Sequence, residues 1–383
     1  MSGKTVSSFG TSPISTHTWS EDGNYLALSC NNKDVEIMKK AKEEGKWIKT
    51  ARLQQHDLLV TGIDWAPKTN RIVTCSEDRN AYVWNLEAGG TWKQTLVLLR
   101  INRAATCVKW SPNENKFAIG SGSRLISVCY LDAVNDWWVA KHIKNKIRST
   151  VTSIDWHPNN CLIAAGSTGY KVRVFSGHIN DIEEKPNETR WENEMKFHTL
   201  MAEFSNSFNG GGWIHSVCFS DDGNRLAWVA HDSSISVVDV TKSLEVYKLK
   251  TQHLPFLSCV WASPDIIIAA GHGCIPVVFK INGSGQIEVV SNLEEKQDYL
   301  QERSFSFRDR LEGMVDVSLN TTHQSQISCI RILRKGKDQA DKISTSGGDG
   351  KVVVWDLRAI EKRIPGLGIL PVRSKNNHLN LSF

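Results

Sequence analysis

The amino-acid sequence predicts an all-β fold, a seven-bladed β-propeller with a helical insertion before the last blade. Three observations support this fold class. A six-residue pattern that ends in a large apolar anchor occurs seven times along the 383 residues. Four of the six intervals between successive anchors measure 42 to 46 residues, close to the length of one propeller blade. The chain also contains 14 Trp, about three times ordinary usage, and a repeated anchor explains this excess.

Each repeat begins with a segment whose first and sixth positions are apolar. The seven segments are Ile14–Trp19, Val60–Trp65, Ala105–Trp110, Val151–Trp156, Ile214–Phe219, Phe256–Trp261 and Ile327–Ile332. A later strand in each repeat ends in a large residue, 18 to 20 positions after the anchor in six repeats and 23 in the seventh. These ends are Met38, Trp84, Tyr130, Phe175, Val238, Phe279 and Trp355. The nearly constant interval indicates a structural repeat.

The pattern inside a repeat is typical of short antiparallel strands. Ala81–Trp84 and Val172–Phe175 alternate in character, and turns rich in Gly, Asn, Asp and Pro separate such runs. One small sheet cannot cover both of its apolar faces, so several must stack around an axis. We therefore expect the aromatic anchors to be structural residues packed between blades. They are Trp19, Trp65, Trp110, Trp156, Phe219 and Trp261.

We expect a single domain over 1–383 with two insertions, about 177–212 and 283–325, where the anchor spacing is longer. The first insertion begins with acidic residues and contains Trp191, Met195 and Phe197. These side chains either contact a partner or pack on the propeller, and the sequence leaves both interpretations open. A C-terminal tail, about 359–383, is broken by Pro and Gly and is expected to pack loosely.

The second insertion contains a predicted helix between Leu293 and Met314. Its apolar residues follow one helical stripe, with basic and acidic residues between them. Such a helix either docks on a partner or folds back on its own blade, and we favour the partner contact. The predicted partner-binding residues are Leu300, Arg303, Phe305, Phe307, Arg308, Arg310, Leu311 and Met314.

Composition and motifs argue against several classes of protein. The net charge is only +5, weak for a nucleic-acid-binding protein. No apolar run approaches the roughly 18 residues of a membrane span, and Met1–Gly10 has no signal-peptide core. The nine Cys contain no CxxC pair, which favours reduced thiols in the cytosol or nucleus and gives no metal spacing. We therefore expect no nucleic-acid partner, no membrane insertion and no bound metal.

The sequence contains no convincing catalytic constellation. It lacks the HExxH, GxSxG and phosphate-loop motifs, and the 12 His are scattered. We expect the small apolar runs Leu162–Gly166 and Ile266–Gly271 to line the central channel, and we see no converging acids in them. The chain is therefore predicted not to be an enzyme and to need no cofactor. Propellers without chemistry usually serve as rigid platforms whose loops bind partners.

Basic residues cluster in several predicted loops. Lys141, Lys144, Lys146 and Arg148 form one cluster, and Arg100 and Arg103 precede the third repeat. A further group contains Arg331, Arg334, Lys335 and Lys337. Solvated loops are the ordinary explanation, and an acidic protein surface is the functional one.

Two repeats resemble the WD-repeat family in their turns and closing dipeptide. Ser76–Trp84 and Ser346–Asp356 carry the tight turn with an Asp, followed by the Trp. In that family the turn Asp can join a hydrogen-bonded set with a His, a Ser or Thr and the Trp. The resemblance therefore implies structural roles for His56, Asp78, Trp84, Asp349 and Trp355. It also implies that the ring closes with an outer strand from the opposite terminus, for which Thr5–Phe9 is the candidate.

The resemblance sharpens in the second to fourth repeats. Val60–Lys68, Leu98–Ala105, Trp110–Arg124 and Asn135–Lys144 resemble the family of WD-repeat subunits of the actin-nucleating, actin-related protein 2/3 complex. The Trp137–Trp138 pair and the Asn102–Ala105 string are not general blade features. The similarity extends from about Pro13 to Leu357.

This resemblance implies a function. Such a subunit helps to hold two actin-related proteins and several small subunits in a cytoplasmic complex of the actin cytoskeleton. When nucleation-promoting factors activate it, the complex binds an actin filament and starts a branch. The insert before the last blade would contact activator or filament. The alternative is a WD-repeat adaptor of another assembly, such as a substrate receptor of a ubiquitin ligase or part of a chromatin complex.

Overall fold

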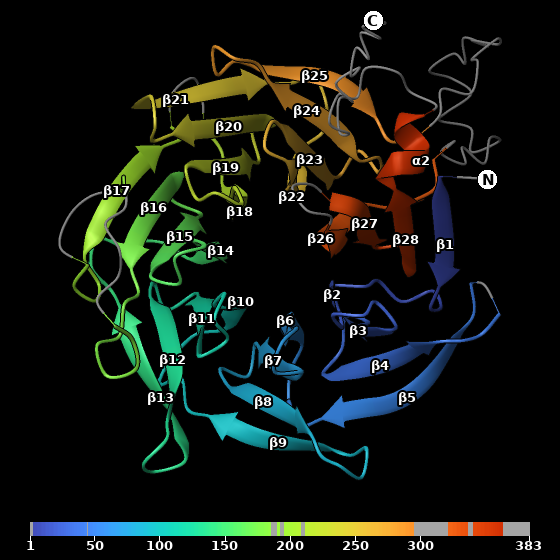
Figure 1. The fold of residues 1–383 in the computed structure, drawn as a ribbon, viewed down its shortest axis with the longest axis vertical. Coiled ribbons are helices and arrows are strands. Elements are labelled where there is room, and N and C mark those ends of the chain that lie inside the picture. The colour runs from blue at the N-terminus through green and yellow to red at the C-terminus, as the bar shows by residue number, and fades with distance from the viewer. Residues whose placement is uncertain are drawn as a thin grey trace, which may run out of the picture.

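The computed structural model describes residues 3–43, 45–184, 190–191, 195–207, 211–294, 321–335 and 340–362. Its strands form seven four-stranded antiparallel sheets that stand as blades around a central axis (Figure 1). The predicted seven-bladed propeller is therefore confirmed. Among the described helices, none is long and apolar enough to cross a membrane.

The first four blades follow one another along the chain, and each runs from the axis outward (Figure 1). Blade 1 contains β2 (Thr16–Trp19), β3 (Tyr25–Ser29), β4 (Asp34–Lys40) and β5 (Trp47–Gln54). Blade 2 contains β6 (Val60–Ala66), β7 (Arg71–Ser76), β8 (Ala81–Leu86) and β9 (Trp92–Val97). Blade 3 contains β10 (Ala105–Trp110), β11 (Lys116–Ser121), β12 (Ile126–Asp132) and β13 (Trp137–Ile143). Blade 4 contains β14 (Val151–Trp156), β15 (Leu162–Ser167), β16 (Lys171–Ser176) and β17 (Leu200–Ser205).

The remaining blades complete the ring. Blade 5 contains β18 (Ile214–Phe219), β19 (Arg225–Ala230), β20 (Ser234–Asp239) and β21 (Ser243–Lys250). Blade 6 contains β22 (Phe256–Ser263), β23 (Ile266–Gly271), β24 (Val277–Ile281) and β25 (Ile287–Asn292). Blade 7 contains β26 (Ile327–Lys335), β27 (Ala340–Gly347), β28 (Lys351–Asp356) and, as its outer strand, β1 (Lys4–Ser8). A short helix, α2 (Leu357–Glu361), follows β28.

The N-terminal strand closes the ring. β1 pairs with β28 in antiparallel register, with Lys4 opposite Trp355 and Ser8 opposite Lys351. The N-terminus and the last blade lie side by side in Figure 1. The predicted closing strand, Thr5–Phe9, is therefore confirmed with a shift of one residue. The first and last parts of the chain thus share one sheet, so the two ends of the repeat array hold each other.

The aromatic anchors fill the contacts between blades. The six predicted anchors are 4% to 8% exposed, although they lie on the first strands, beside the central channel. Trp65, for example, packs in a cluster with Val35 and Leu53 of blade 1. Their burial accounts for the Trp excess through packing alone.

The prediction for the channel lining is wrong. The innermost strand of each blade is its first strand, whereas β15 and β23, which contain Leu162–Gly166 and Ile266–Gly271, are second strands. All six residues of β15 and of β23 are buried. These strands are apolar on both faces because a neighbouring blade covers each face. Two first strands, β10 and β14, each contain three half-buried residues, as expected for strands that border a channel.

Both predicted insertions contain the fourth strand of a blade. β17 lies within 177–212 and pairs with β16, and β25 lies within 283–325 and pairs with β24. The extra residues are therefore confined to the connections before β17 and after β25 and to a short connection after β17. The tail beyond 362 lies outside the described residues.

Two kinds of connection between strands lie on the same face of the propeller. With four antiparallel strands to a blade, the crossovers between blades and the turns between second and third strands end on the same face. The backbone shows this directly, because the N–H of Glu77 donates to Leu59 O at 3.0 Å and that of His231 to Trp213 O at 2.8 Å. We call this side of the ring the crossover face.

Candidate functional site

The predicted partner-binding residues of the second insertion lie outside the described residues. They are Leu300, Arg303, Phe305, Phe307, Arg308, Arg310, Leu311 and Met314, all within 295–320. The predicted helix there stays a prediction. What the structure does describe is the point where this segment leaves and rejoins the propeller, which we call the root (Glu294 and residues 321–324).

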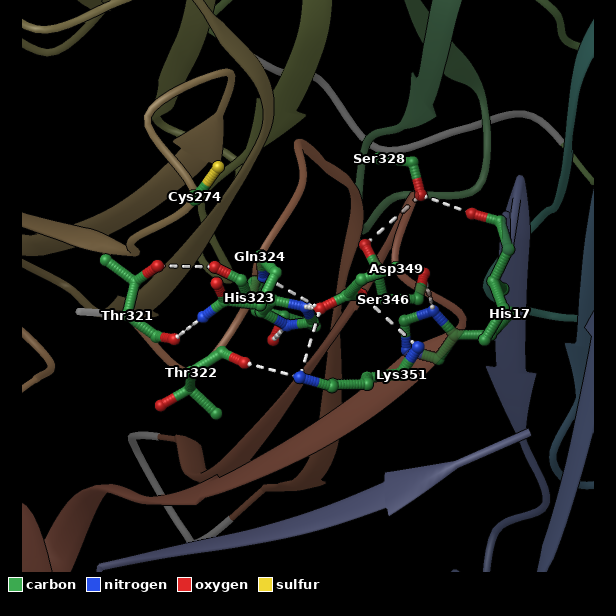
Figure 2. Close-up of polar contacts among 12 residues, drawn as sticks. His17, Cys274, Thr321, Thr322, His323, Gln324, Ser328, Ser346, Asp349 and Lys351 are labelled. Atoms are coloured by element: carbon green, nitrogen blue, oxygen red, sulfur yellow. Dashed lines mark hydrogen bonds and ion pairs between the residues drawn. The ribbon is translucent and has the colours of Figure 1, made fainter. Parts of the chain in front are cut away.

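The root holds the two ends of the segment together on the crossover face. The backbone N–H of Thr322 donates to Glu294 Oε1 at 2.8 Å, which joins the last residue before the segment to the second residue after it. Lys351 Nζ donates to Thr322 O at 3.1 Å, and Lys4 Nζ donates to Thr322 Oγ1 at 2.5 Å (Figure 2 shows the Lys351 contact). Strands β1 and β28 thus both bind the root, so it sits at the seam where the ring closes.

A buried polar set beneath the root fixes its geometry (Figure 2). His323 Nδ1 lies 3.1 Å from Asp349 Oδ1, and His323 Nε2 lies 2.8 Å from Thr345 Oγ1. Trp355 Nε1 donates to the same hydroxyl at 3.0 Å. Burial opposes ionisation of Asp349, but hydrogen bonds from His323 and the Gln324 N–H outweigh it and lower its pKa to about 2. The charged carboxylate therefore holds residues 323 and 324 in place.

Blade 2 contains the same set. His56 Nδ1 lies 2.8 Å from Asp78 Oδ2, His56 Nε2 lies 2.8 Å from Thr74 Oγ1, and Trp84 Nε1 donates to Thr74 Oγ1 at 3.0 Å. Burial again opposes ionisation of Asp78, and the hydrogen bond from His56 lowers its pKa. The structure therefore brings His56, Asp78 and Trp84 together as the family pattern implied. The hydroxyl of Thr74 is the shared partner.

Sequence reasoning missed His323, Thr345 and Thr74, although a signal for each exists. His323 precedes its anchor Ile332 by nine residues, as His56 precedes Trp65. Each Thr precedes the closing Trp by ten residues. Aligning the seventh repeat on the second would therefore have predicted the complete set.

Blades 1 and 5 replace this set with different contacts. In blade 1, His17 lies on the first strand between Ser346 Oγ at 2.8 Å and Ser344 Oγ at 2.7 Å, both from blade 7. In blade 5, Asp232 accepts from Ser234 Oγ and from Lys248 Nζ, and none of the described His residues donates to it. The turn carboxylate is thus retained in blade 5 with other donors.

The central channel encloses about 1090 Å³, and five acids among the described residues line it that the sequence analysis did not place there: Glu21, Asp64, Glu114, Asp155 and Asp221. Two of these acids link neighbouring blades. Asp64 Oδ2 accepts from the N–H of Trp110, and Asp155 Oδ2 from the N–H of Phe219, each at 2.8 Å. Burial raises the pKa of Asp155, and Lys109, 3.9 Å away, opposes that rise. Each carboxylate therefore joins its blade to the next one. The prediction of no converging acids came from assigning the wrong strand to the channel.

Arg331 also lies in this channel and not in a surface cluster. Its Nε donates to His17 O and its Nη2 to Ile63 O, both at 3.2 Å, and its Nη1 lies 3.9 Å from Asp64 Oδ1. A blade 7 guanidinium thus contacts blades 1 and 2. The side chains of Arg334 and Lys335, and Lys337 as a whole, lie outside the described residues.

Exposed cations gather on the crossover face of blades 2 to 4. We call them the basic sector: Arg79, Arg100, Arg103, Arg124, Lys144, Lys146 and Arg148. Within the described chain, no ion pair neutralises any of them. The loops that carry them hold one exposed carboxylate, Glu77. Lys141, which we grouped with them from sequence, instead pairs with Asp181 at 2.8 Å.

Several residues of the basic sector occupy unfavourable backbone positions. Arg79, Arg100, Arg124 and Lys146 have φ values of 70°, 52°, 58° and 58°. This left-handed region favours Gly or Asn and costs another residue roughly 1 kcal/mol. Nine other non-glycine residues of the described chain share this conformation, so it marks the tight turns of the propeller, four of which here carry a long cation.

The first insertion packs on the propeller through its Trp. Trp191 is 4% exposed, its Nε1 donates to Gly223 O at 2.8 Å, and its ring lies 5.6 Å from that of Phe219. Of the two interpretations left open, packing therefore holds for Trp191. Met195 is partly buried between blades 4 and 5, and Phe197 is partly buried between blades 3 and 4.

One cluster in the described part of the chain has side chains of the metal-binding type. His178 Nδ1 lies 3.8 Å from Cys161 Sγ and 3.3 Å from Glu183 Oε2. The ammonium of Lys116, which is fully buried, forms an ion pair with the same Glu183 oxygen. Lys116 thus already supplies the positive charge that a zinc ion would bring.

Comparisons with known proteins agree with this architecture. The family model described as WD domain, G-beta repeat matches residues 46–85 and 141–176. The chain is 49% identical over 366 residues to actin-related protein 2/3 complex subunit 1A-A of Xenopus laevis, covering 94% of this chain and 98% of that protein. It is 40% identical to subunit 1 of the same complex in Schizosaccharomyces pombe, covering 90% and 97%. It is 37% identical to subunit 1A in Arabidopsis thaliana, covering 92% and 96%.

Proposed function

The chain belongs to the family of actin-related protein 2/3 complex subunit 1, and from this premise we propose that it is the non-catalytic propeller subunit of such a complex. The complex nucleates branched actin filaments when nucleation-promoting factors activate it, and it works in the cytoplasm at the actin cytoskeleton. The observation that carries the proposal is the similarity over nearly the whole chain to subunits from an animal, a yeast and a plant.

The propeller acts as a scaffold in this proposal. Its partners are the actin-related proteins and the small subunits, and nucleotide chemistry belongs to the actin-related partners. The closed ring supports this role, because hydrogen bonds through β1 and β28 join its ends and fix the relative positions of the surface loops. A rigid surface loses little conformational freedom on binding.

The segment after Glu294 contacts activator or filament. Support comes from its apolar stripe and from the root, where Thr322, Glu294 and Lys351 hold both ends of the segment on the crossover face. The basic sector lies on that same face. Because actin filaments and the activating peptides are acidic, unpaired Arg and Lys side chains suit either partner.

The first test asks which proteins assemble with the chain. The tagged full chain is isolated from lysate at moderate salt, and its stoichiometric companions are identified by mass spectrometry. We expect two actin-related proteins and several small subunits. A ubiquitin-ligase or chromatin scaffold, or no companion, would overturn the proposal.

The second test addresses the segment. Phe305, Phe307 and Leu311 are replaced together by Ala in the purified complex, and activated branching is followed by fluorescence microscopy of actin. We expect normal assembly and several-fold fewer branches, because apolar anchors carry most of such contacts. The matched control is Leu244→Ala with Val289→Ala, two exposed residues of the outer strands β21 and β25. Equal branch numbers in both variants would refute the segment's role.

A further inference from the structure

The outer hairpin of blade 3 exposes two large apolar side chains at its end. Val134 is 92% exposed and Trp137 is 61% exposed, the two highest values among the large apolar side chains of the described residues. They lie at the turn between β12 and β13, which projects from the ring in Figure 1. We call residues 132–137 the blade 3 tip.

The blade 3 tip is held in a fixed shape. Asp132 Oδ1 accepts from the N–H of Val134 at 3.0 Å, and Asp132 Oδ2 accepts from Asn135 Nδ2 at 2.8 Å. Strand pairing continues to the end of the hairpin, with Asp132 opposite Trp137. A preformed turn loses little entropy when it binds.

The residue after Trp137 faces the opposite way and secures the hairpin. The ring of Trp138 lies 5.8 Å from that of Trp110 and 5.0 Å from that of Phe117, both in the core of blade 3. Because side chains alternate along a strand, this packing turns Trp137 to the other face of the sheet, toward solvent. Trp137 therefore contributes nothing visible to the core.

Corresponding hairpins show that the fold does not need an apolar tip. The connections between third and fourth strands in blades 1, 2, 5 and 6 read AKEEGK, EAGGT, VTK and NGSGQ, at 41–46, 87–91, 240–242 and 282–286. They consist mainly of Gly and of polar or charged residues, which suit exposed turns. The matching connection in blade 3 reads AVND, at 133–136, and Trp137 follows it as the first residue of β13. Blades 1 and 2 also begin their fourth strands with a Trp, but Trp47 and Trp92 are half-buried against Trp19 and Trp65, whereas Trp137 is exposed. The exposed Trp of blade 3 thus calls for a reason outside the propeller.

The charge around the blade 3 tip indicates the kind of partner. From Ile126 to Ala140 the sequence contains two acids, Asp132 and Asp136, and no Lys or Arg, although the whole chain has a net charge of +5. The tip is thus an apolar projection with an acidic border. Its complement is a groove lined by apolar residues and bordered by Lys or Arg.

We propose that the blade 3 tip is a docking contact for another protein subunit, with Trp137 inserted into an apolar, basic-rimmed groove of that subunit. This inference rests on the proposed function, because it takes the partner to be a neighbour within the same complex. Trp137 is the anchor, Val134 extends the apolar contact, and Asp136 faces the basic border. Trp is the residue most enriched among side chains that dominate interfaces.

The test measures binding of the full chain to the complex assembled without it. Trp137→Ser should weaken binding about 30-fold, the size of a strong interface anchor. Asp136→Lys should weaken it about 5-fold at low salt and less at high salt. The matched control is Ile48→Ser on β5, which removes a side chain that is 57% exposed at another place on the rim. Circular dichroism melting should be the same for all four chains.

A footprint separates burial from any indirect effect. Hydroxyl-radical oxidation of Trp137, read by mass spectrometry, should slow several-fold when the wild-type chain joins the complex. Equal oxidation in free and bound chain, or unchanged affinity of Trp137→Ser, would overturn this inference while leaving the proposed function intact. If the wild-type chain itself does not bind the remaining subunits, both the proposed function and this inference fail.

Discussion

At the residue scale, a single hydroxyl organises each of two buried polar sets. In blade 2 the carboxylate of Asp78 can only accept, so His56 donates through Nδ1, and in the neutral imidazole Nε2 accepts from Thr74. The hydroxyl of Thr74 in turn accepts from Trp84 Nε1. Each hydrogen bond therefore has a defined donor and acceptor. The four side chains satisfy one another's hydrogen-bonding groups.

The first prediction removes that hydroxyl. Thr74→Val keeps the shape but leaves Trp84 Nε1 and His56 Nε2 without their partner in a buried site. We expect a loss of about 2–3 kcal/mol in the free energy of unfolding, the cost of unpaired buried polar groups. Urea titration measures it, and Thr91→Val at an exposed position in the turn of the same blade serves as the control. A loss below about 0.5 kcal/mol would show that the set contributes little to stability.

The second prediction concerns pH and the buried imidazole of His17. Burial, with help from Arg331 and His323, lowers its pKa from 6.5 to about 3. Between these values the unfolded chain binds a proton that the folded chain excludes, so stability rises with pH across this window. His17 therefore contributes fully above pH 6.5 and loses about 2 kcal/mol by pH 5.

Urea unfolding at pH 7.5 and pH 5 measures this effect. His17→Gln should be less stable than wild type at pH 7.5, because it loses its contacts to Ser344 and Ser346, yet it should lose less stability on acidification. His253→Gln, at an exposed position, is the control. The same pH dependence in His17→Gln and in wild type would contradict the assignment.

At the element scale, the sequence predicted strands where the signal is local. The first and third strands recur at fixed intervals, so their positions follow from the anchors and closing residues alone. The fourth strands β17 and β25 were included in insertions, because long connections separate them from the repeat. The channel lining was misassigned because β15 and β23 are apolar on both faces, a pattern that reports burial but not distance from the axis.

The third prediction concerns the root. Asp349→Ala removes the acceptor for the Gln324 N–H and for His323, so residues 321–324 lose their attachment to the turn of blade 7. We expect amide hydrogen exchange at Gln324 to accelerate at least about tenfold, while exchange in β22 to β24 stays unchanged. Mass spectrometry of short peptides measures both.

A second carboxylate offers the control for this change. Asp132 fixes the blade 3 tip by similar hydrogen bonds to backbone N–H groups. Asp132→Ala should accelerate exchange in that tip and leave Gln324 as in wild type. If Asp349→Ala left exchange at Gln324 unaltered, the root would be held by Lys351 and Glu294 without the carboxylate.

At the scale of the whole molecule, neighbouring blades are joined by one recurring hydrogen bond. The second residue of a first strand donates its hydroxyl to the carbonyl of the first residue in the next blade's first strand, as from Thr61 to Ala105 O at 2.9 Å and from Thr106 to Val151 O at 2.6 Å. Ser328 donates to Ile14 O, two residues before β2, at 2.6 Å and so continues the series from blade 7 to blade 1. The small hydroxyl residues at this position are visible in the sequence, but their partners follow only from the ring.

His215 and Leu257 take this position in blades 5 and 6 and cannot supply the same hydroxyl. The third position then carries the contact, because Ser216 Oγ accepts from the N–H of Cys259 at 3.3 Å and Ser258 Oγ from that of Ile330 at 3.1 Å. Every blade therefore depends on its neighbours through groups beside the channel. A ring built this way is stable only when it is closed.

The fourth prediction tests that closure. Deleting residues 1–8 removes β1, which pairs along its whole length with β28. The deletion exposes the backbone N–H and C=O groups of β28 as a free edge and frees Trp355 from the cation of Lys4, 5.7 Å from its ring. We expect the thermal midpoint to fall by several degrees and the chain to self-associate, measured by calorimetry and size-exclusion chromatography. Val6→Ser, which changes an exposed side chain but keeps the strand, should behave as wild type.

A deleted chain that stayed monomeric with an unchanged midpoint would mean that the contacts beside the channel close the ring without β1. The outer strand of blade 7 would then serve some purpose other than stability.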